Sequence, residues 1–237
     1  MKKVILILGI FISVIYSVNA QKTIKGNGNL ASETRKTSSY DEIKLVGSTK
    51  IEIIDGKEGE LTITGDSNLL AYVETTVQHN VLTVKFKDNH SYNTRKGIRI
   101  HVPVEDISKI SLIGSGDIES KKTLTDKKID VYLQGSGDIF LEVASENITA
   151  EVVGSGDLTL KGKTHHLKAS VKGSGDFKGK NLTSQIAELY VNGSGDIEAY
   201  VNQKVVAEVI GSGDIEVKGS PNQVVKNIKG SGDIDVK

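Results

Sequence analysis

One tetrapeptide, Gly-Ser-Gly-Asp, occurs seven times in the C-terminal half of the chain, at steps of 18 to 21 residues. The copies begin at Gly114, Gly135, Gly154, Gly173, Gly193, Gly211 and Gly230. Repetition at such a period is typical of a solenoid, in which each repeat is one coil that buries its apolar side against its neighbours. The repeat therefore constrains the fold strongly, and it contains no pattern that specifies a reaction.

Apolar and polar residues alternate around each tetrapeptide, whose first Gly is numbered position 0. Position −2 holds Leu112, Leu133, Val152, Val171, Val191, Val209 and Ile228, and position +4 holds Ile118, Ile139, Leu158, Phe177, Ile197, Ile215 and Ile234. Position −4 is apolar in six copies and fails only at Lys226. This alternation predicts strands with one buried face, with both glycines inward and Ser and Asp outward.

These patterns predict an all-β chain. We expect a right-handed parallel β-helix-like solenoid of ~19-residue coils over residues 111–237, with strands of successive coils about 4.8 Å apart. It continues from a less regular β region over residues 39–110, where residues 42–53 look like a worn coil with Gly47 at position 0 and Lys50 in place of Asp. Strands are also expected at residues 61–64, 81–86 and 98–102, with a polar loop at residues 87–97. Residues 21–38 are expected to be flexible or bound at a sheet edge.

The first twenty residues have the pattern of a secretory signal peptide. Lys2 and Lys3 form a basic start, residues 4–16 are almost entirely apolar, and Val18-Asn19-Ala20 offers a cleavage site after Ala20. The chain is therefore expected to be exported to the periplasm, the cell surface or the medium. No later stretch approaches the roughly 20 apolar residues of a membrane helix, so no membrane span is expected in the mature chain.

Composition excludes several classes of function. The chain has no cysteine, which excludes disulfides and thiolate chemistry. Without Lys2 and Lys3, 28 basic residues face 30 acidic ones. A nearly neutral chain has no general attraction for nucleic acid, and we expect no nucleic-acid partner. No cofactor-binding motif is present, and no cofactor is expected.

Several stretches resemble the family called putative auto-transporter adhesin head domain, or GIN domain. They are Gly65-Asp66-Ser67-Asn68-Leu69-Leu70, then Val73, Thr75 and Val77, then Leu82-Thr83-Val84, residues 98–103, and the Gly-Ser-Gly-Asp-Ile units. The resemblance covers about residues 38–220. It implies an exported protein of Gram-negative bacteria with a β-helix-like fold, and it assigns no functional residues.

A row of carboxylates is the most regular candidate site. In stacked coils, Asp117, Asp138, Asp157, Asp176, Asp196, Asp214 and Asp233 would repeat every ~5 Å along one outer edge. We interpret each Asp as the cap of its own turn. The alternative is a row of calcium sites, as in the nonapeptide repeats of secreted toxins. Those repeats read Gly-Gly-x-Gly-x-Asp at a nine-residue step, which differs from this chain, so no metal site is assigned.

The remaining candidates give no catalytic or metal-binding constellation. His165 and His166 are adjacent, and neighbours on a strand face opposite sides, so they are not expected to bind one ion; we interpret them as part of a polar turn. His79, His90 and His101 lack the spacing of a metal site. Nothing brings Asp55 and Asp66 together as paired carboxylates, and no Gly-x-Ser-x-Gly elbow with a partner is present. No catalytic residue is therefore predicted.

The sequence leaves three functions open. The first is a non-enzymatic exported module that presents a β-helical surface for adhesion or ligand binding, with a surface glycan or protein as its partner. The second is a carbohydrate-active β-helix enzyme. The low aromatic content of 5%, the lack of Trp and the lack of Arg after Arg99 argue against it. The third is a purely structural cell-envelope protein. The oligomeric state is left open.

Overall fold

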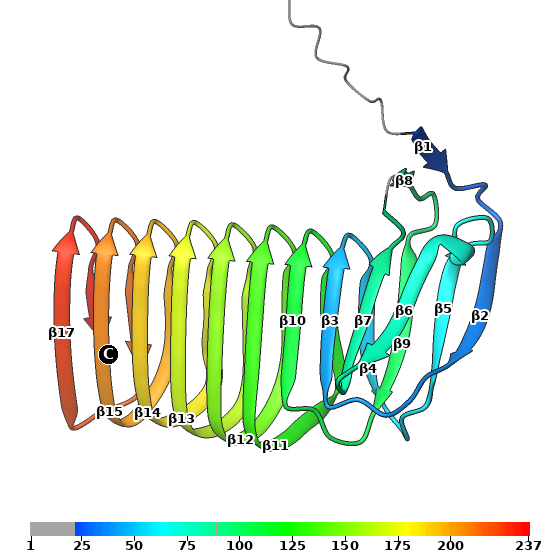
Figure 1. The fold of residues 1–237 in the computed structure, drawn as a ribbon. Helices are drawn as coiled ribbons and strands as arrows, with labels where there is room; N and C mark the ends of the chain where they lie inside the picture. Colours follow the sequence, from blue (N-terminus) through cyan, green and yellow to red (C-terminus); the bar gives the residue numbers. More distant parts are fainter. Residues whose placement is uncertain (1–21, 89) are drawn as a thin grey trace, which may run out of the picture.

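The computed structural model describes residues 22–88 and 90–237. The expected signal peptide and its cleavage site after Ala20 lie outside these residues. The described chain is almost entirely β-structure, with a solenoid of about seven turns in the C-terminal part and a less regular N-terminal half, as predicted (Figure 1). Within the described ranges, no helix has the length and apolar character needed to cross a membrane.

Each coil of the solenoid has two flat arms. Arm A leads into a Gly-Ser-Gly turn and arm B follows it; residues 158–162 form one arm B, and residues 167–173 form the arm A that comes after it. The long strands run from arm B through a corner into arm A. The solenoid strands are β10 (Lys109–Gly114), β11 (Asp117–Gly135), β12 (Asp138–Gly154), β13 (Leu158–Gly173), β14 (Phe177–Gly193), β15 (Ile197–Gly211), β16 (Ile215–Lys218), β17 (Gln223–Gly230) and β18 (Ile234–Val236).

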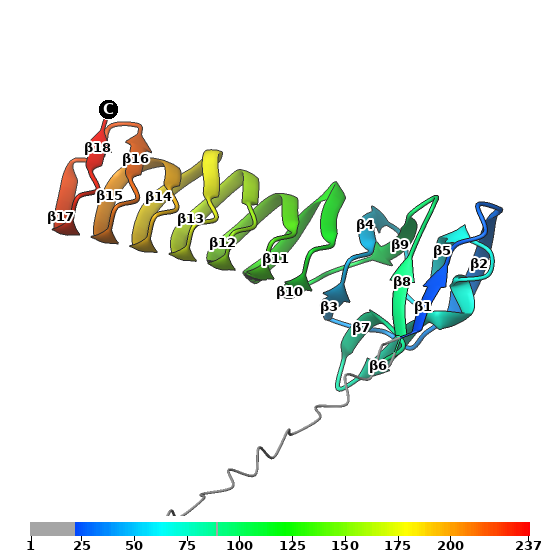
Figure 2. The same cartoon turned by 90° about the horizontal axis from the view of Figure 1, so that it is seen from above.

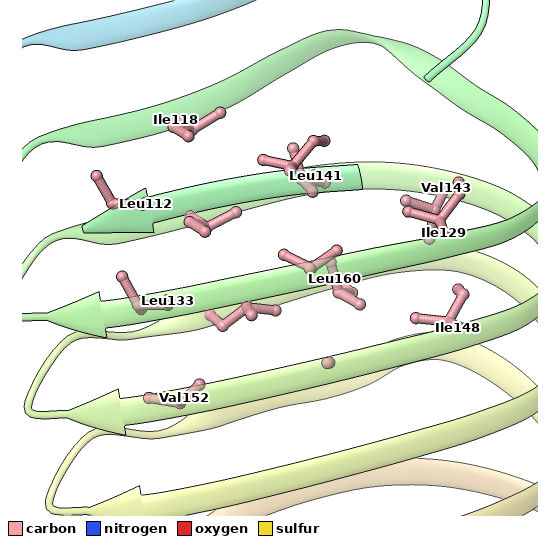
Figure 3. Packing of buried hydrophobic residues seen from close by; sticks show 14 of the residues in the cluster. Leu112, Ile118, Ile129, Leu133, Leu141, Val143, Ile148, Val152 and Leu160 are labelled. Atoms are coloured by element: carbon pink, nitrogen blue, oxygen red, sulfur yellow. The ribbon is translucent and has the colours of Figure 1, made fainter. Parts of the chain in front are cut away.

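Successive coils pair in parallel and in register, so equivalent residues form straight columns. Gly114 pairs with Gly135, and Gly135 with Gly154. The inward columns fill the space between the two arms, where Leu112, Leu133 and Val152 lie one above another (Figure 3). Fully burying one such side chain contributes about 1.5–3 kcal/mol. The expected inward phase is confirmed, except at the open end, where Ile228 remains 42% exposed.

The Gly-Ser-Gly turns stack too closely for side chains. A Cβ placed on Gly156 would lie 2.0 Å from the carbonyl oxygen of Gly137 in the preceding coil. Gly154 adds a second constraint, because its φ of 121° lies in the region that side chains disfavour. The two turn glycines are therefore required by backbone contact between coils.

The worn coil is present, but the chain inserts other strands between it and the next coil. β3 (Glu42–Gly47) pairs with β10, and β4 (Lys50–Asp55) pairs with β11, which places Lys50 beside Asp117. On their other side, β3 pairs in parallel with β7 (Val81–Phe86), and β4 with β9 (Ile98–Val104). The first coil, formed by β3 and β4, therefore has neighbours on both sides that occur later in the sequence.

Antiparallel strands close the N-terminal end. β5 (Glu60–Asp66) pairs with β9, β6 (Val73–Gln78) pairs with β7, and the 3₁₀ helix η1 (Leu70–Tyr72) precedes β6. β2 (Leu30–Lys36) lies along β5, so this part of residues 21–38 is bound at a sheet edge. β1 (Lys22–Lys25) pairs in parallel with β8 (His90–Asn93) (Figure 2). The expectation of a pure loop over residues 87–97 was wrong, since β8 lies within it.

Candidate binding faces

The aspartate row caps the turns of neighbouring coils. Oδ1 of Asp157 accepts the N–H of Asp176 (3.2 Å), and Oδ1 of Asp176 accepts the N–H of Asp196 (3.0 Å). The same bond joins Asp138 to Asp157, Asp196 to Asp214, and Asp214 to Asp233. The expected structural role is present in five of the seven aspartates, but it was assigned to the wrong turn, because these five carboxylates bind the turn of the next coil.

These bonds account for one oxygen in five of the seven carboxylates of the row. The ammonium group of Lys178 also pairs with the second oxygen of Asp157. Among residues 22–88 and 90–237, no group of three or more His, Cys, Asp or Glu side chains is arranged to hold a metal ion. The calcium interpretation therefore gains no support from the geometry.

Asp66 is a buried tether. Its side chain is fully buried; Oδ1 accepts the N–H of Gly28 (2.7 Å), and Oδ2 accepts the N–H groups of Arg95 (2.8 Å) and Lys96 (3.0 Å). The N–H of Lys96, with those of Arg95 and Gly28, lowers the pKa of Asp66 against the opposing effect of burial. Asp55 is highly exposed and pairs with Lys122 (2.9 Å) elsewhere. The two acids do not form a catalytic pair.

The histidine pair is arranged differently from the expectation. His165 and His166 are both exposed, and their ring centroids lie 4.5 Å apart at 89°. The rule of opposite faces fails here because the chain bends at the corner between the arms. His101 lies apart from them and forms a 2.9 Å contact with Glu52. His165 and His166 therefore lie together on one exposed corner.

Shallow depressions lie along the outer surface of arm A, and two of them contain a tyrosine. The first measures ≈ 720 Å³ and lies where β7 and β3 meet β10, β11 and β12. Tyr132, Lys109 and Glu151 are among its lining residues. Lys128 bonds one oxygen of Asp130 (2.7 Å), while the other oxygen of Asp130 is buried and has no partner in the described chain. This depression therefore offers a tyrosine ring and charges of both signs.

The second depression, of ≈ 520 Å³, surrounds Tyr190 on the same face. The ammonium group of Lys168 lies 5.8 Å from the centroid of the Tyr190 ring, and Ile210 beside them is 41% exposed. Burial, together with the charge of Glu188, raises the pKa of the Tyr190 hydroxyl above its ordinary value. Lys172 and Glu151 pair at 2.7 Å on the rim.

Tyr132 and Tyr190 belong to one outward column of arm A, which also contains Glu151, Ser170 and Glu208. A half-exposed tyrosine surrounded by hydroxyl, amide and charged groups is suited to contact polar ligands that also carry apolar surface. The chemistry of this face suits binding.

The sequence profile of the family described as putative auto-transporter adhesin, head GIN domain, matches residues 39–221. The chain belongs to this family. No match was found among curated proteins. The resemblance deduced from the Gly65–Leu70 motif and the repeats is thereby confirmed.

Solved structures of other bacterial proteins have the same fold. A putative adhesin from Bacteroides fragilis is 24% identical, with a TM-score of 0.86 over 90% of this chain and 100% of that one. A protein from Parabacteroides distasonis described as a putative lipid binding protein is 28% identical, with a TM-score of 0.75 over 91% and 100%. A putative adhesin from Parabacteroides merdae is 19% identical, with a TM-score of 0.72 over 91% and 99%.

The sequence reasoning missed this face of arm A for an identifiable reason. It followed the residues that recur in every copy, and the tyrosines recur in two copies of seven at position −3. A comparison of the outward positions column by column would have found Tyr132 and Tyr190 at the same position. Outward columns that vary between coils are where a solenoid differs from coil to coil, so they are where specificity can reside.

Proposed function

We propose that this chain is a non-enzymatic exported binding module of the adhesin type, which contacts its partner through the outer surface of arm A. The observation that carries the proposal is the column containing Tyr132 and Tyr190, with a depression around each ring on one flat face. Membership of the adhesin family supports it. The partner class is a surface glycan or a protein.

The description of the Parabacteroides distasonis relative suggests lipid as another ligand class. In this chain, apolar side chains fill the space between the arms; Leu133, Val152 and Val171 are fully buried there. The packed interior leaves no room for an acyl chain, so a lipid would have to bind on the outside. Lipid vesicles therefore belong in the test as a competing probe.

The test uses the mature chain on glycan and host-protein arrays, with Tyr190→Ala and Tyr132→Ala as variants. Tyr200→Ala is the matched control, because Tyr200 is a half-buried tyrosine on arm B. Truncating a central interface aromatic typically costs about 2 kcal/mol, which is about 30-fold in affinity. We expect such a loss for at least one arm A variant and less than about threefold for the control.

Other outcomes would contradict parts of the proposal. Equal losses for Tyr190→Ala and Tyr200→Ala would remove arm A as the binding face. Binding to vesicles alone would replace the glycan or protein partner with lipid. The absence of any array ligand would favour the purely structural cell-envelope role, and hydrolysis or cleavage of an arrayed polysaccharide would favour the enzyme.

Export is part of the proposal and has its own test. The basic start, the apolar run and the small residues before position 21 support cleavage after Ala20. Mass spectrometry of cell fractions should find Gln21 as the N-terminus of the extracytoplasmic protein. A cytoplasmic chain that retains Met1 would contradict it.

A further inference from the structure

The C-terminal end of the solenoid exposes an unpaired edge. β17 pairs with β15 and β18 pairs with β16, and no described strand covers their other side (Figure 2). Val224 and Ile228 face inward in register with Val205 and Val209, yet they are 41% and 42% exposed. An apolar edge with free backbone groups is a template for pairing with another chain.

At this edge, side chains form hydrogen bonds with the backbone N–H and C=O of Ile234. In the earlier coils the equivalent N–H donates to the next coil, as Ile215 does to the carbonyl oxygen of Asp233 (2.9 Å). Because the N–H and C=O of one strand residue face the same side, both groups of Ile234 face the open end. Its N–H donates to Oδ1 of Asp233 (2.8 Å), and its carbonyl oxygen accepts the ammonium of Lys226 (2.7 Å).

Asp233 departs from the pattern of its row. In the preceding coil, Oδ1 of Asp214 accepts the N–H of Asp233 (2.8 Å). No described coil pairs with the open side of Asp233, and its Oδ1 instead accepts the N–H of the residue directly after it. The carboxylate that elsewhere joins two coils here closes the last one.

Lys226 is the single charged residue at position −4. Its column otherwise contains Ile110, Val131, Ala150, Ala169, Leu189 and Ala207. From arm A, its side chain reaches Ile234 on arm B, across the end of the core. Ile234 is only 3% exposed, although it lies in the last coil. A further coil would have to bury this ammonium in an apolar column, which is costly for an unpaired charge.

We propose that Lys226 and Asp233 form an end cap that prevents a second copy of this chain from docking on the last coil. A second copy is the relevant partner because it would present the same edge. The N-terminal end presents different edge strands, β6 and β2, so the contact between like edges is the one in which two C-terminal edges meet around a twofold axis. Such contact forms a closed dimer and not a filament.

The test is sedimentation velocity of the mature chain with Lys226→Val, which restores the apolar pattern. Lys229→Val is the matched control, since Lys229 is an exposed lysine on the same strand that pairs outward with Glu208 (3.3 Å). We expect dimerisation at least tenfold tighter for Lys226→Val than for the wild type and the control. If Lys226→Val does not fold, Lys226→Ala replaces it, because alanine occupies this column in three other coils.

A second change locates the interface. Adding Val224→Lys to Lys226→Val puts a charge back on the inward side of the last coil and should restore the monomer. A folded Lys226→Val that is as monomeric as the control would overturn the proposal. A dimer that Val224→Lys leaves unchanged would also overturn it, because the association would then involve another surface.

Discussion

Replacing Gly156 with alanine tests whether backbone contact between coils requires the glycines of the turns. The new Cβ would lie 2.0 Å from the carbonyl oxygen of Gly137. An ordinary contact between carbon and oxygen needs about 3.3 Å, so the two turns must separate by roughly 1.3 Å. The N–H groups of Ser155 and Gly156 now donate to the oxygen of Gly135 at 2.8 and 3.0 Å, and both bonds would break at that separation.

The expected cost follows from these bonds and from the residual strain. Two backbone hydrogen bonds contribute about 1–3 kcal/mol together, and overpacking adds a similar amount. Because the coils can relax partly, we expect Gly156→Ala to lower the free energy of unfolding by about 2–4 kcal/mol. For a chain of this size, this corresponds to a fall of about 5–15 °C in the melting temperature.

The assay is urea and thermal unfolding followed by far-UV circular dichroism. Ser155→Ala is the matched control, because Ser155 is exposed and adjacent and its change should stay within about 0.5 kcal/mol. If Gly156→Ala and Ser155→Ala unfold at the same midpoint, the contact between stacked turns does not limit this position, and the argument fails.

Three other changes test the core, the aspartate row and the tether. Val171→Asp buries an unpaired carboxylate and should lower the free energy of unfolding by about 3 kcal/mol or more, whereas the outward Lys172→Asp should lower it by under about 1 kcal/mol. Equal urea midpoints for the two variants would show that the assigned inward phase is wrong. Millimolar calcium should leave the melting temperatures of the wild type and of Asp214→Asn unchanged relative to chelator, since the asparagine oxygen can still accept the turn N–H. A calcium-induced rise in the melting temperature that the variant abolishes would establish a cation site. Because the pKa of Asp66 is lowered in the folded chain, its contribution to stability is full above the unfolded pKa of about 3.9 and is lost as pH falls through the folded pKa. Asp66→Asn should therefore flatten the acid side of the curve of unfolding free energy against pH. An unchanged pH dependence of stability would refute the role of Asp66 as a tether.

The solenoid could be predicted because its causes are local and repeated. Alternation around each tetrapeptide fixes which side chains face inward, and Val171 and Phe177 are buried as that phase requires. The worn coil was found for the same reason, since Gly47 and Ile51 keep the phase after the aspartate has become Lys50. In each case one residue type at one spacing has one physical role.

The remaining features depend on contacts between distant parts of the sequence. No local pattern shows that β7 and β9 lie beside the first coil. The partner of Asp66 is the backbone of two remote loops, and backbone N–H groups leave no signature in a sequence. Lys226 was noticed as an exception to the repeat, but its role follows only from its place in the last coil.

The displaced order of the first coil has a consequence for how the chain assembles. Gly135 pairs with a residue 19 positions along the chain, whereas Gly47 pairs with Gly114, 67 positions away. Closing the longer loop costs about 1 kcal/mol more in chain entropy. Coils from β11 onward can form one after another through short-range contacts. β3 and β4 are paired on both edges only after β7, β9, β10 and β11 have formed. Loss of coils from the C-terminal end would shorten the solenoid. Loss of the pairing between β3 and β10 would instead separate the N-terminal strands from the solenoid in one cooperative step.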